Sequence, residues 1–405
     1  MKFIEGGVCA AKGFKASGIH VGVKTSNTEK KDLALIAADC DCAAAAVYTR
    51  NVVKAAPLLV TNEHLQKGRA RAVIVNSGNA NACAPDGAEN ARRMCRAAAS
   101  ALGIREADVI VASTGVIGQR LPVEVIENKT AELVSHLSYN GSNDAAAAIM
   151  TTDLAMKECA VEFEISGRLV KIGGIAKGSG MIHPNMGTML AFLTTDCAIS
   201  RTMISKALSN AANVSFNRIS IDGDTSTNDM LSLFASGLAG NDEITVQGAD
   251  YEAFTDALDS VCVELAKMMA ADGEGAAHMI TCRVRGAKNE AEAETLSKSV
   301  ISSTLVKAMI FGADANCGRV LCALGYSGVI FDPSLVDVEF ESIAGRIKVC
   351  EKGLGLRFDE ETAKKILTER DVTIDISMDA GDAECTCWGC DITYDYIKIN
   401  GDYRT

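Results

Sequence analysis

The chain has 405 residues, enough to bury a sizeable core in two or three domains. Its net charge is −12, aromatic residues make up 5% and no block of Lys and Arg occurs, so we expect no nucleic-acid partner. No apolar run approaches the ~20 residues of a membrane span, and the N-terminus lacks the apolar core of a signal peptide. Fifteen irregularly spaced cysteines favour reduced thiols and a cytoplasmic location.

Apolar runs broken by glycine predict strands and turns through residues 1–60. Beyond them, hydrophobic patterning predicts a further series of elements up to the middle of the chain. These are strands at 72–76 and 108–112, helices at 86–102 and 122–136, a short helix capped by Asn143, a hairpin over 159–175 and a strand at 189–193.

The second half predicts helices at 202–212, from Tyr251 to about 271, at 304–311 and at 360–369. Residues 284–296 are polar and indicate either a surface connection or an exposed helix start, so we place a domain boundary there, giving domains 1–285 and 286–405. Strands and helices mix without a strict alternation, which favours an α+β fold in layers over a doubly wound sheet.

A glycine-rich polar loop begins at Lys177 and ends at Gly187, and Thr188 stands where it enters an apolar strand. A threonine hydroxyl is a weak nucleophile unless a base takes its proton, and its own α-amine can do so only when the threonine is N-terminal. We therefore consider that the Gly187–Thr188 bond is cut and that Thr188 then acts as nucleophile. The local pattern alone is more typical of an ordinary turn than of a nucleophile.

Ser-Thr-Gly-Val-Ile-Gly at 113–118 follows a buried strand. The Thr114 hydroxyl and the Gly115 N–H could form an oxyanion hole there, although a plain strand-end turn has the same pattern. His183 is a rival base, but a lone loop histidine is more often a hydrogen-bonding residue, and we give it no catalytic role.

Two cysteine groups and one acidic loop suggest metal sites, and we predict none. Zinc sites usually show paired Cys-x-x-Cys or His ligands at defined distances. Neither Cys385, Cys387 and Cys390, which have no histidine nearby, nor Cys40 and Cys42 complete such a set. The acidic loop at 222–229 lacks the glycine and terminal glutamate of an EF-hand at their required offsets.

The chain resembles, over essentially its whole length, the ornithine acetyltransferases, also called bifunctional glutamate N-acetyltransferases, of arginine biosynthesis. Seven ordered segments carry the resemblance. They are Asn-Ser-Gly-Asn-Ala-Asn-Ala-Cys at 76–83, Ser-Thr-Gly-Val-Ile-Gly at 113–118, Lys-Gly-Ser-Gly-Met-Ile at 177–182, Pro-Asn-Met-Gly-Thr-Met-Leu at 184–190, the segment 216–229, Asp-Gly-Glu-Gly at 272–275, and the tail from Trp388 to Thr405.

The resemblance implies a layered α/β sandwich of the self-cleaving aminopeptidase and ornithine acetyltransferase type, with a smaller C-terminal α+β domain. It implies cleavage before Thr188 and transfer of acetyl from N-acetylornithine to glutamate through acetyl-Thr188, with Thr114 and Gly115 as the oxyanion hole. The substrate-contacting positions it implies are Thr151 (favoured over Thr152), Lys177, Thr188, Glu274, Asn400 and Thr405. Two copies of each cleaved chain are the family's assembly, and no tightly bound cofactor is expected.

Some positions depart from the family pattern. Gly187 stands where alanine is more common, and Ala277 and His278 replace Thr or Ser followed by a basic residue. Cys317 replaces a tryptophan, and Cys385 and Cys387 replace small residues. None of these changes removes a catalytic group.

Three functions follow as alternatives. The first is the acetyltransferase, with acetyl-CoA left open as a second donor. The second is an amidase or aminopeptidase of the same self-cleaving fold, in which water is the acceptor. The third is an uncleaved binding protein, against which the intact Thr188, Thr114 and Gly115 argue.

Overall fold

A computed structural model of the chain describes residues 1–24, 28–183 and 189–402. The chain divides into two compact units. The first comprises Met1–Gly178 and the later segments up to Met269, and the second comprises the residues from Ala270 onward together with Ser179–His183 and Arg218–Gly223. The expected boundary at 285/286 instead falls inside strand β11 (Met279–Ala287), because that whole strand belongs to the second unit's sheet.

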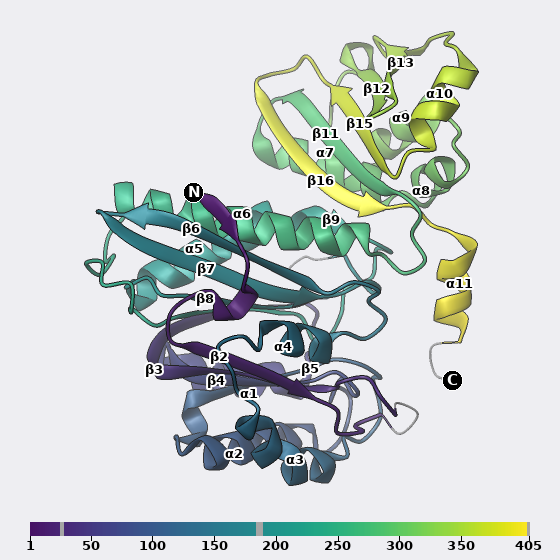
Figure 1. Cartoon of the computed structure of the whole chain (residues 1–405). Helices are drawn as coiled ribbons and strands as arrows, with labels where there is room; N and C mark the ends of the chain where they lie inside the picture. Colours follow the sequence, from purple (N-terminus) through teal and green to yellow (C-terminus); the bar gives the residue numbers. More distant parts are fainter. Residues whose placement is uncertain (25–27, 184–188, 403–405) are drawn as a thin grey trace. The chain divides into compact units, whose positions relative to one another are not determined.

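One mixed sheet organises the first unit (Figure 1). Among the described residues it has nine strands in the order β1-β6-β7-β8-β10-β3-β4-β5, with β2 paired to β3. β8 runs parallel to β10, and β4 runs parallel to β5; the other neighbours are antiparallel. The strands are β1 (Lys2–Ile4), β2 (Phe14–Ile19), β3 (Leu33–Tyr48), β4 (Arg69–Asn76), β5 (Val109–Ser113), β6 (Lys157–Ile165), β7 (Arg168–Lys177), β8 (Leu190–Thr195) and β10 (Met230–Ala235).

Strands at the β3-β4-β5 side of this sheet are buried on both faces. Val73 and Val75 point into one core cluster, which also holds residues of α4, and Ile74 points into another, which holds residues of α2 and α3. This alternation follows from the two-residue period of a strand, and it explains why residues 72–75 of β4 are apolar without interruption. The helices of the unit are α1 (Ala56–His64), α2 (Gly87–Leu102), α3 (Val123–Ser135), α4 (Ser142–Ile149), α5 (Arg201–Val214) and α6 (Ala249–Ala271).

The second unit has a sheet of its own, with the order β14-β13-β12-β15-β11-β16-β9 among the described residues. Its strands are β9 (Ile219–Ser220), β11, β12 (Asp337–Ser342), β13 (Gly345–Glu351), β14 (Leu354–Gly355), β15 (Asp371–Ser377) and β16 (Ala383–Cys390). Its helices are α7 (Glu290–Ser302), α8 (Thr304–Phe311), α9 (Cys317–Gly325), α10 (Glu360–Leu367) and α11 (Tyr394–Gly401).

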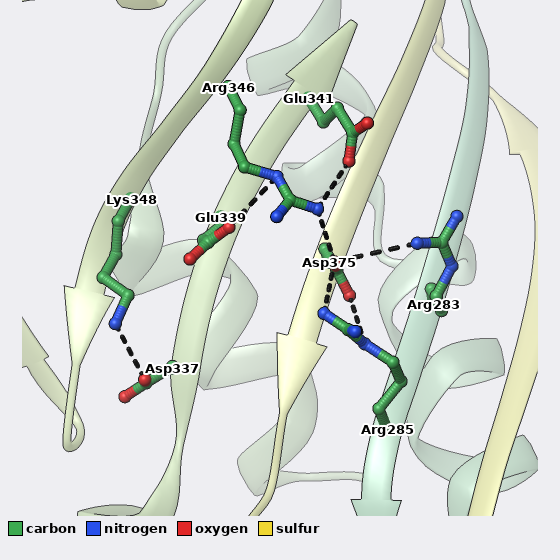
Figure 2. Close-up of polar contacts among 8 residues, drawn as sticks. All are labelled: Arg283, Arg285, Asp337, Glu339, Glu341, Arg346, Lys348 and Asp375. Carbon is green, nitrogen blue, oxygen red and sulfur yellow. Dashed lines mark hydrogen bonds and ion pairs between the residues drawn. The ribbon is translucent and has the colours of Figure 1, made fainter.

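This second sheet is apolar on one face and charged on the other. Val284 and Ile374 lie in the core, whereas their strand neighbours Arg285 and Asp375 form ion pairs on the opposite face (Figure 2). The Asp375 side chain is only 2% exposed, because Arg283, Arg285 and Arg346 surround its carboxylate.

The expected α+β class is confirmed, and the strongly periodic elements form where the sequence predicts them, including the helix at 304–311 and the hairpin around Ser166. Asn143 is not the cap of α4: the helix begins one residue earlier, and the Asn143 amide donates to Glu158 Oε1 at 2.7 Å. The polar stretch 284–296 is the end of β11 and the start of α7. No described helix has the length and apolar content needed to cross a bilayer.

Candidate active site

The predicted nucleophile Thr188 and its neighbour Gly187 lie outside the described residues. The strand expected after Thr188 is present as β8, which begins at Leu190 and is hydrogen-bonded on both sides, to β7 and to β10. Lys177 at the end of β7 pairs with Leu190, and Leu190 pairs with Met230 at the start of β10. The chain therefore enters the interior of a sheet directly after the predicted cleavage point.

The predicted oxyanion hole lies at the ends of two parallel strands. Asn76 ends β4 and Ser113 ends β5, and the two residues are register partners. The Asn76 amide donates to Ser113 Oγ at 2.7 Å, and its oxygen accepts from the Asn79 N–H at 3.0 Å. These bonds hold the loop 76–83 against residues 113–118. We name residues 113–118 the oxyanion loop.

Gly115 is required by the geometry of the oxyanion loop. Its φ is +126°, and a Cβ added there would lie 2.7 Å from the Gly78 carbonyl carbon. The Thr114 N–H donates to the Asn76 carbonyl at 2.9 Å. By contrast, neither the Thr114 hydroxyl nor the Gly115 N–H has a hydrogen-bond partner among the described residues. Two unused donors side by side are what an oxyanion hole requires.

Lys177 and Thr151, two of the positions predicted to contact substrate, lie together. The Lys177 ammonium donates to Thr151 Oγ1 at 2.7 Å and lies 3.8 Å from Asp153 Oδ2. The Asp153 carboxylate also accepts from the Lys157 ammonium and from the Gly178 N–H, both at 2.7 Å. The lysine is thus fixed in direction by a threonine hydroxyl and a buried carboxylate.

Two lysines favour the charged form of the Asp153 carboxyl. The Asp153 side chain is fully buried, and although burial opposes ionisation, the charges of Lys177 and Lys157 hold the pKa of its carboxyl below the usual range. The Asp153 carboxylate and the two ammonium groups therefore stabilise one another's charged forms.

Asp229, immediately before β10, is a buried acid of a different kind. Neither carboxyl oxygen has a hydrogen-bond partner among the described residues. Burial raises the pKa of Asp229 well above its ordinary value. Burial therefore favours the neutral form of this side chain.

In the second unit, Glu274 and Asn400, two of the positions predicted to contact substrate, are in contact with each other. The Asn400 amide donates to Glu274 Oε2 at 2.8 Å, and the Glu274 N–H donates to the Ser179 carbonyl at 2.7 Å. Gly180 leaves room for the carboxylate, because a Cβ there would lie 2.3 Å from Glu274 Oε2. Thr405 lies outside the described residues.

His183, the rival base, has a neutral imidazole at physiological pH. Burial, aided by the charge of Lys298, lowers its pKa to about 4, and its Nδ1 lies 3.0 Å from Ser220 Oγ. At positions 277 and 278, where the sequence departs from the family pattern, the Asp391 carboxylate accepts from both backbone N–H groups and contacts His278 Nδ1 at 2.7 Å. His278 is therefore fixed in the second unit by a buried acid.

The three cysteines of β16 are buried thiols. Cys385 and Cys387 belong to the core of the second unit, and the Ser297 hydroxyl lies 3.1 Å from Cys387 Sγ. Within the described part of the chain, no group of three or more His, Cys, Asp or Glu residues is arranged to hold a metal ion.

Comparison with known proteins identifies the family. The sequence model of the ArgJ family matches residues 15–405. The chain belongs to the ArgJ family. An arginine biosynthesis bifunctional protein ArgJ of Symbiobacterium thermophilum is 50% identical over 406 residues and covers 100% of both chains, and ArgJ 1 of Clostridium acetobutylicum is 48% identical over 97% of this chain and 96% of its own.

A crystal structure of the arginine biosynthesis bifunctional protein argJ of Bacillus halodurans matches with a TM-score of 0.50 and 44% identity. The match covers 53% of this chain and 99% of that one. The solved ArgJ chain is thus about half as long as the sequence described here.

Several polar residues of this site lie outside the set that the sequence singled out. Asp153, which contacts Lys177, directly follows Thr151 and Thr152 in the sequence. Its contacts with Lys157 and Lys177 depend on the pairing of β6 with β7, which the sequence alone does not specify. Asn228 and Asp229 end the family segment 216–229. The motif marks this segment, but nothing in it assigns a role to these two side chains.

Proposed function

We propose that this ArgJ family member is an acyltransferase that moves the acetyl group of N-acetylornithine to glutamate in arginine biosynthesis. The observation that carries the proposal is a pair of donors, the Thr114 hydroxyl and the Gly115 N–H, that have no hydrogen-bond partner in residues 1–24, 28–183 and 189–402. Asn76 holds their loop at the ends of β4 and β5. Such donors stabilise the oxyanion of an acyl-transfer intermediate.

In the first half-reaction the Thr188 hydroxyl attacks the acetyl carbonyl, and its proton passes through the Thr188 α-amine to the departing amine of ornithine. The amide C–N bond breaks and an acetyl ester of Thr188 forms. In the second half-reaction the amine of glutamate attacks that ester, N-acetylglutamate leaves, and the hydroxyl regains its proton. Lys177 and Thr151 complement the substrate carboxylate, and Glu274, Asn400 and Thr405 contribute the remaining substrate contacts.

The α-amine exists only after the Gly187–Thr188 bond is cut, so the proposal includes self-cleavage into chains of 187 and 218 residues. The length of the Bacillus halodurans chain supports it, because its match spans 53% of 405 residues, or about 215. The proposal also includes assembly of two copies of each chain and a cytoplasmic location. It requires no tightly bound cofactor.

The test combines one gel and one assay. Purified active protein should show two bands, and Thr188→Ala should show one full-length band and no transfer. Incubation with N-acetylornithine should yield N-acetylglutamate only when glutamate is present. Ornithine and acetate released at the same rate without glutamate would instead indicate the amidase, and transfer at the normal rate by Thr188→Ala would assign the nucleophile elsewhere.

A second donor is proposed as well. The curated relatives are named bifunctional, which favours acetyl-CoA as an additional source of the acetyl group on the same Thr188. Formation of N-acetylglutamate from acetyl-CoA and glutamate by the wild-type protein, and its loss in Thr188→Ala, would support this; absence of the product in the wild type would contradict it.

A further inference from the structure

Asn228 makes an unusual set of buried hydrogen bonds. Its side-chain nitrogen donates both hydrogens, to the Ala80 carbonyl at 2.6 Å and to the Ser113 carbonyl at 2.8 Å. Its side-chain oxygen accepts from the Thr227 hydroxyl at 2.6 Å, and the residue is only 6% exposed. Every hydrogen-bonding position of this amide nitrogen is therefore occupied, and its orientation is fixed.

These bonds join parts of the first unit that the sheet itself connects only indirectly. Ser113 ends β5 and precedes Thr114 and Gly115, and Ala80 lies in the loop after β4. Asn228 stands two residues before β10, the direct neighbour of β8. In the sheet, however, β3 and β4 separate β10 from β5.

We propose that Asn228 is a positioning residue that holds the oxyanion loop at a fixed distance from the β8–β10 strand pair. This inference rests on the proposed function, which places the nucleophile directly before β8 and the oxyanion hole at Thr114 and Gly115. Within the described residues, the hydrogen bonds of the Asn228 side chain are to the carbonyls of Ala80 and Ser113 and from the Thr227 hydroxyl. Asn228 acts through the Ser113 carbonyl, one residue from the predicted hole.

The test uses Asn228→Asp, which keeps the shape of the side chain but replaces the NH2 group and its two N–H donors by one carboxylate oxygen that faces the two carbonyl oxygens. We expect kcat for acetyl transfer to fall about 100-fold, as for a displaced or missing oxyanion donor. The KM for N-acetylornithine should stay within about threefold, because Lys177 and Thr151 are untouched. Self-cleavage of the freshly made precursor should slow as well, since it passes through an oxyanion of the same kind.

Asn81→Asp is the matched control. Asn81 is also fully buried in the loop after β4, and its amide donates to the Gly87 carbonyl at 2.8 Å without contacting Ser113. It should lose thermal stability to a similar degree while its kcat stays within about threefold of the parent. Asn228→Ala, which introduces no charge, is measured alongside in case the aspartate variant does not fold.

The outcomes separate the two proposals. If Asn228→Asp and Asn228→Ala turn over within threefold of the parent while Thr188→Ala is inactive, the positioning role is wrong and the proposed function stands. If Asn81→Asp loses as much kcat as Asn228→Asp at the same melting temperature, the loss reflects general destabilisation and the positioning role is again wrong. An active Thr188→Ala contradicts the proposed function itself.

Discussion

Thr151 contributes a single polar contact, and its energetic value can be isolated. Thr151→Val keeps the shape of the side chain but removes the oxygen that accepts from the Lys177 ammonium at 2.7 Å. A hydrogen bond to a charged group contributes about 1.5–3 kcal/mol, so we expect the KM for N-acetylornithine to rise at least tenfold. Steady-state kinetics would measure this. Thr152→Val is the control, and a larger KM increase in that variant would assign the contact to Thr152.

Asp229 makes stability depend on pH in a direction opposite to that of most carboxylates. Because its pKa is raised in the folded protein, the folded state keeps a proton that the unfolded chain releases above its ordinary pKa of about 4. Its contribution to stability is therefore fully present below that pH and declines as the pH rises toward the folded pKa.

Asp229→Asn should remove this dependence, since an amide releases no proton. Melting temperatures of the parent and the variant, measured from pH 5 to pH 8, should diverge in favour of the variant as the pH rises. Parallel curves for the two proteins over this range would show that Asp229 is ionised in the folded state.

At the scale of one loop, Gly115 and Gly118 form a natural pair for testing the oxyanion loop. Both have positive φ, +126° and +79°, but a Cβ at Gly115 meets the Gly78 backbone at 2.7 Å, whereas one at Gly118 meets nothing within 4 Å. Gly115→Ala should lower kcat by about 100-fold because the loop must move. Gly118→Ala should cost about 1 kcal/mol of stability and leave kcat near that of the parent. Equal losses of kcat would contradict the assignment.

The charged face of the second sheet should stabilise its unit mainly through one carboxylate. Asp375 is 2% exposed and contacts Arg285 at 2.6 Å and Arg346 at 3.1 Å, whereas Glu341, on the same network, is 41% exposed (Figure 2). Asp375→Ala should lower the free energy of unfolding by about 1–3 kcal/mol, and Glu341→Ala by less than about 1 kcal/mol. Denaturant titration of both variants would test this order, and a larger loss for Glu341→Ala would reverse it.

Elements with strong local signals were predictable from the sequence, and contacts between distant segments were not. Helix α8 follows from its apolar period and the β6–β7 hairpin from its Ser166-Gly167 turn. The predicted cap of α4 is wrong because the side chain of Asn143, a residue type that often caps helices, donates a hydrogen bond to Glu158 of β6 instead. Tertiary contacts of this kind override local propensity.

The candidate site shows the same limit. The resemblance predicts Lys177 and Thr151 as substrate contacts. It does not predict that Asp153 fixes the lysine, or that Asn228 bonds to Ser113, 115 residues away in the sequence. Such bonds depend on the order and register of strands that no local pattern specifies. The residues that touch substrate can thus be transferred from a family motif, whereas those that hold them in place require the fold.

At the scale of the molecule, the predicted cleavage would divide a single sheet between two chains. β8 and β10 belong to the second product, and their neighbours β7 and β3 belong to the first. Both strands are hydrogen-bonded along their length and buried. The products should therefore elute together from a size-exclusion column and separate only in denaturant. Elution of a free 187-residue chain under native conditions would contradict this.

The interior position of β8 also makes the reactive group a product of folding. A nascent or misfolded chain contains Thr188 only as an ordinary internal residue, without an α-amine. Under the proposed mechanism that amine is released only after the strands around β8 have assembled and brought the cleavage machinery together. Each active molecule has consequently folded before its chain was cut, and the cut is irreversible. The ratio of cut to uncut chain therefore measures the fraction of a preparation that has folded correctly.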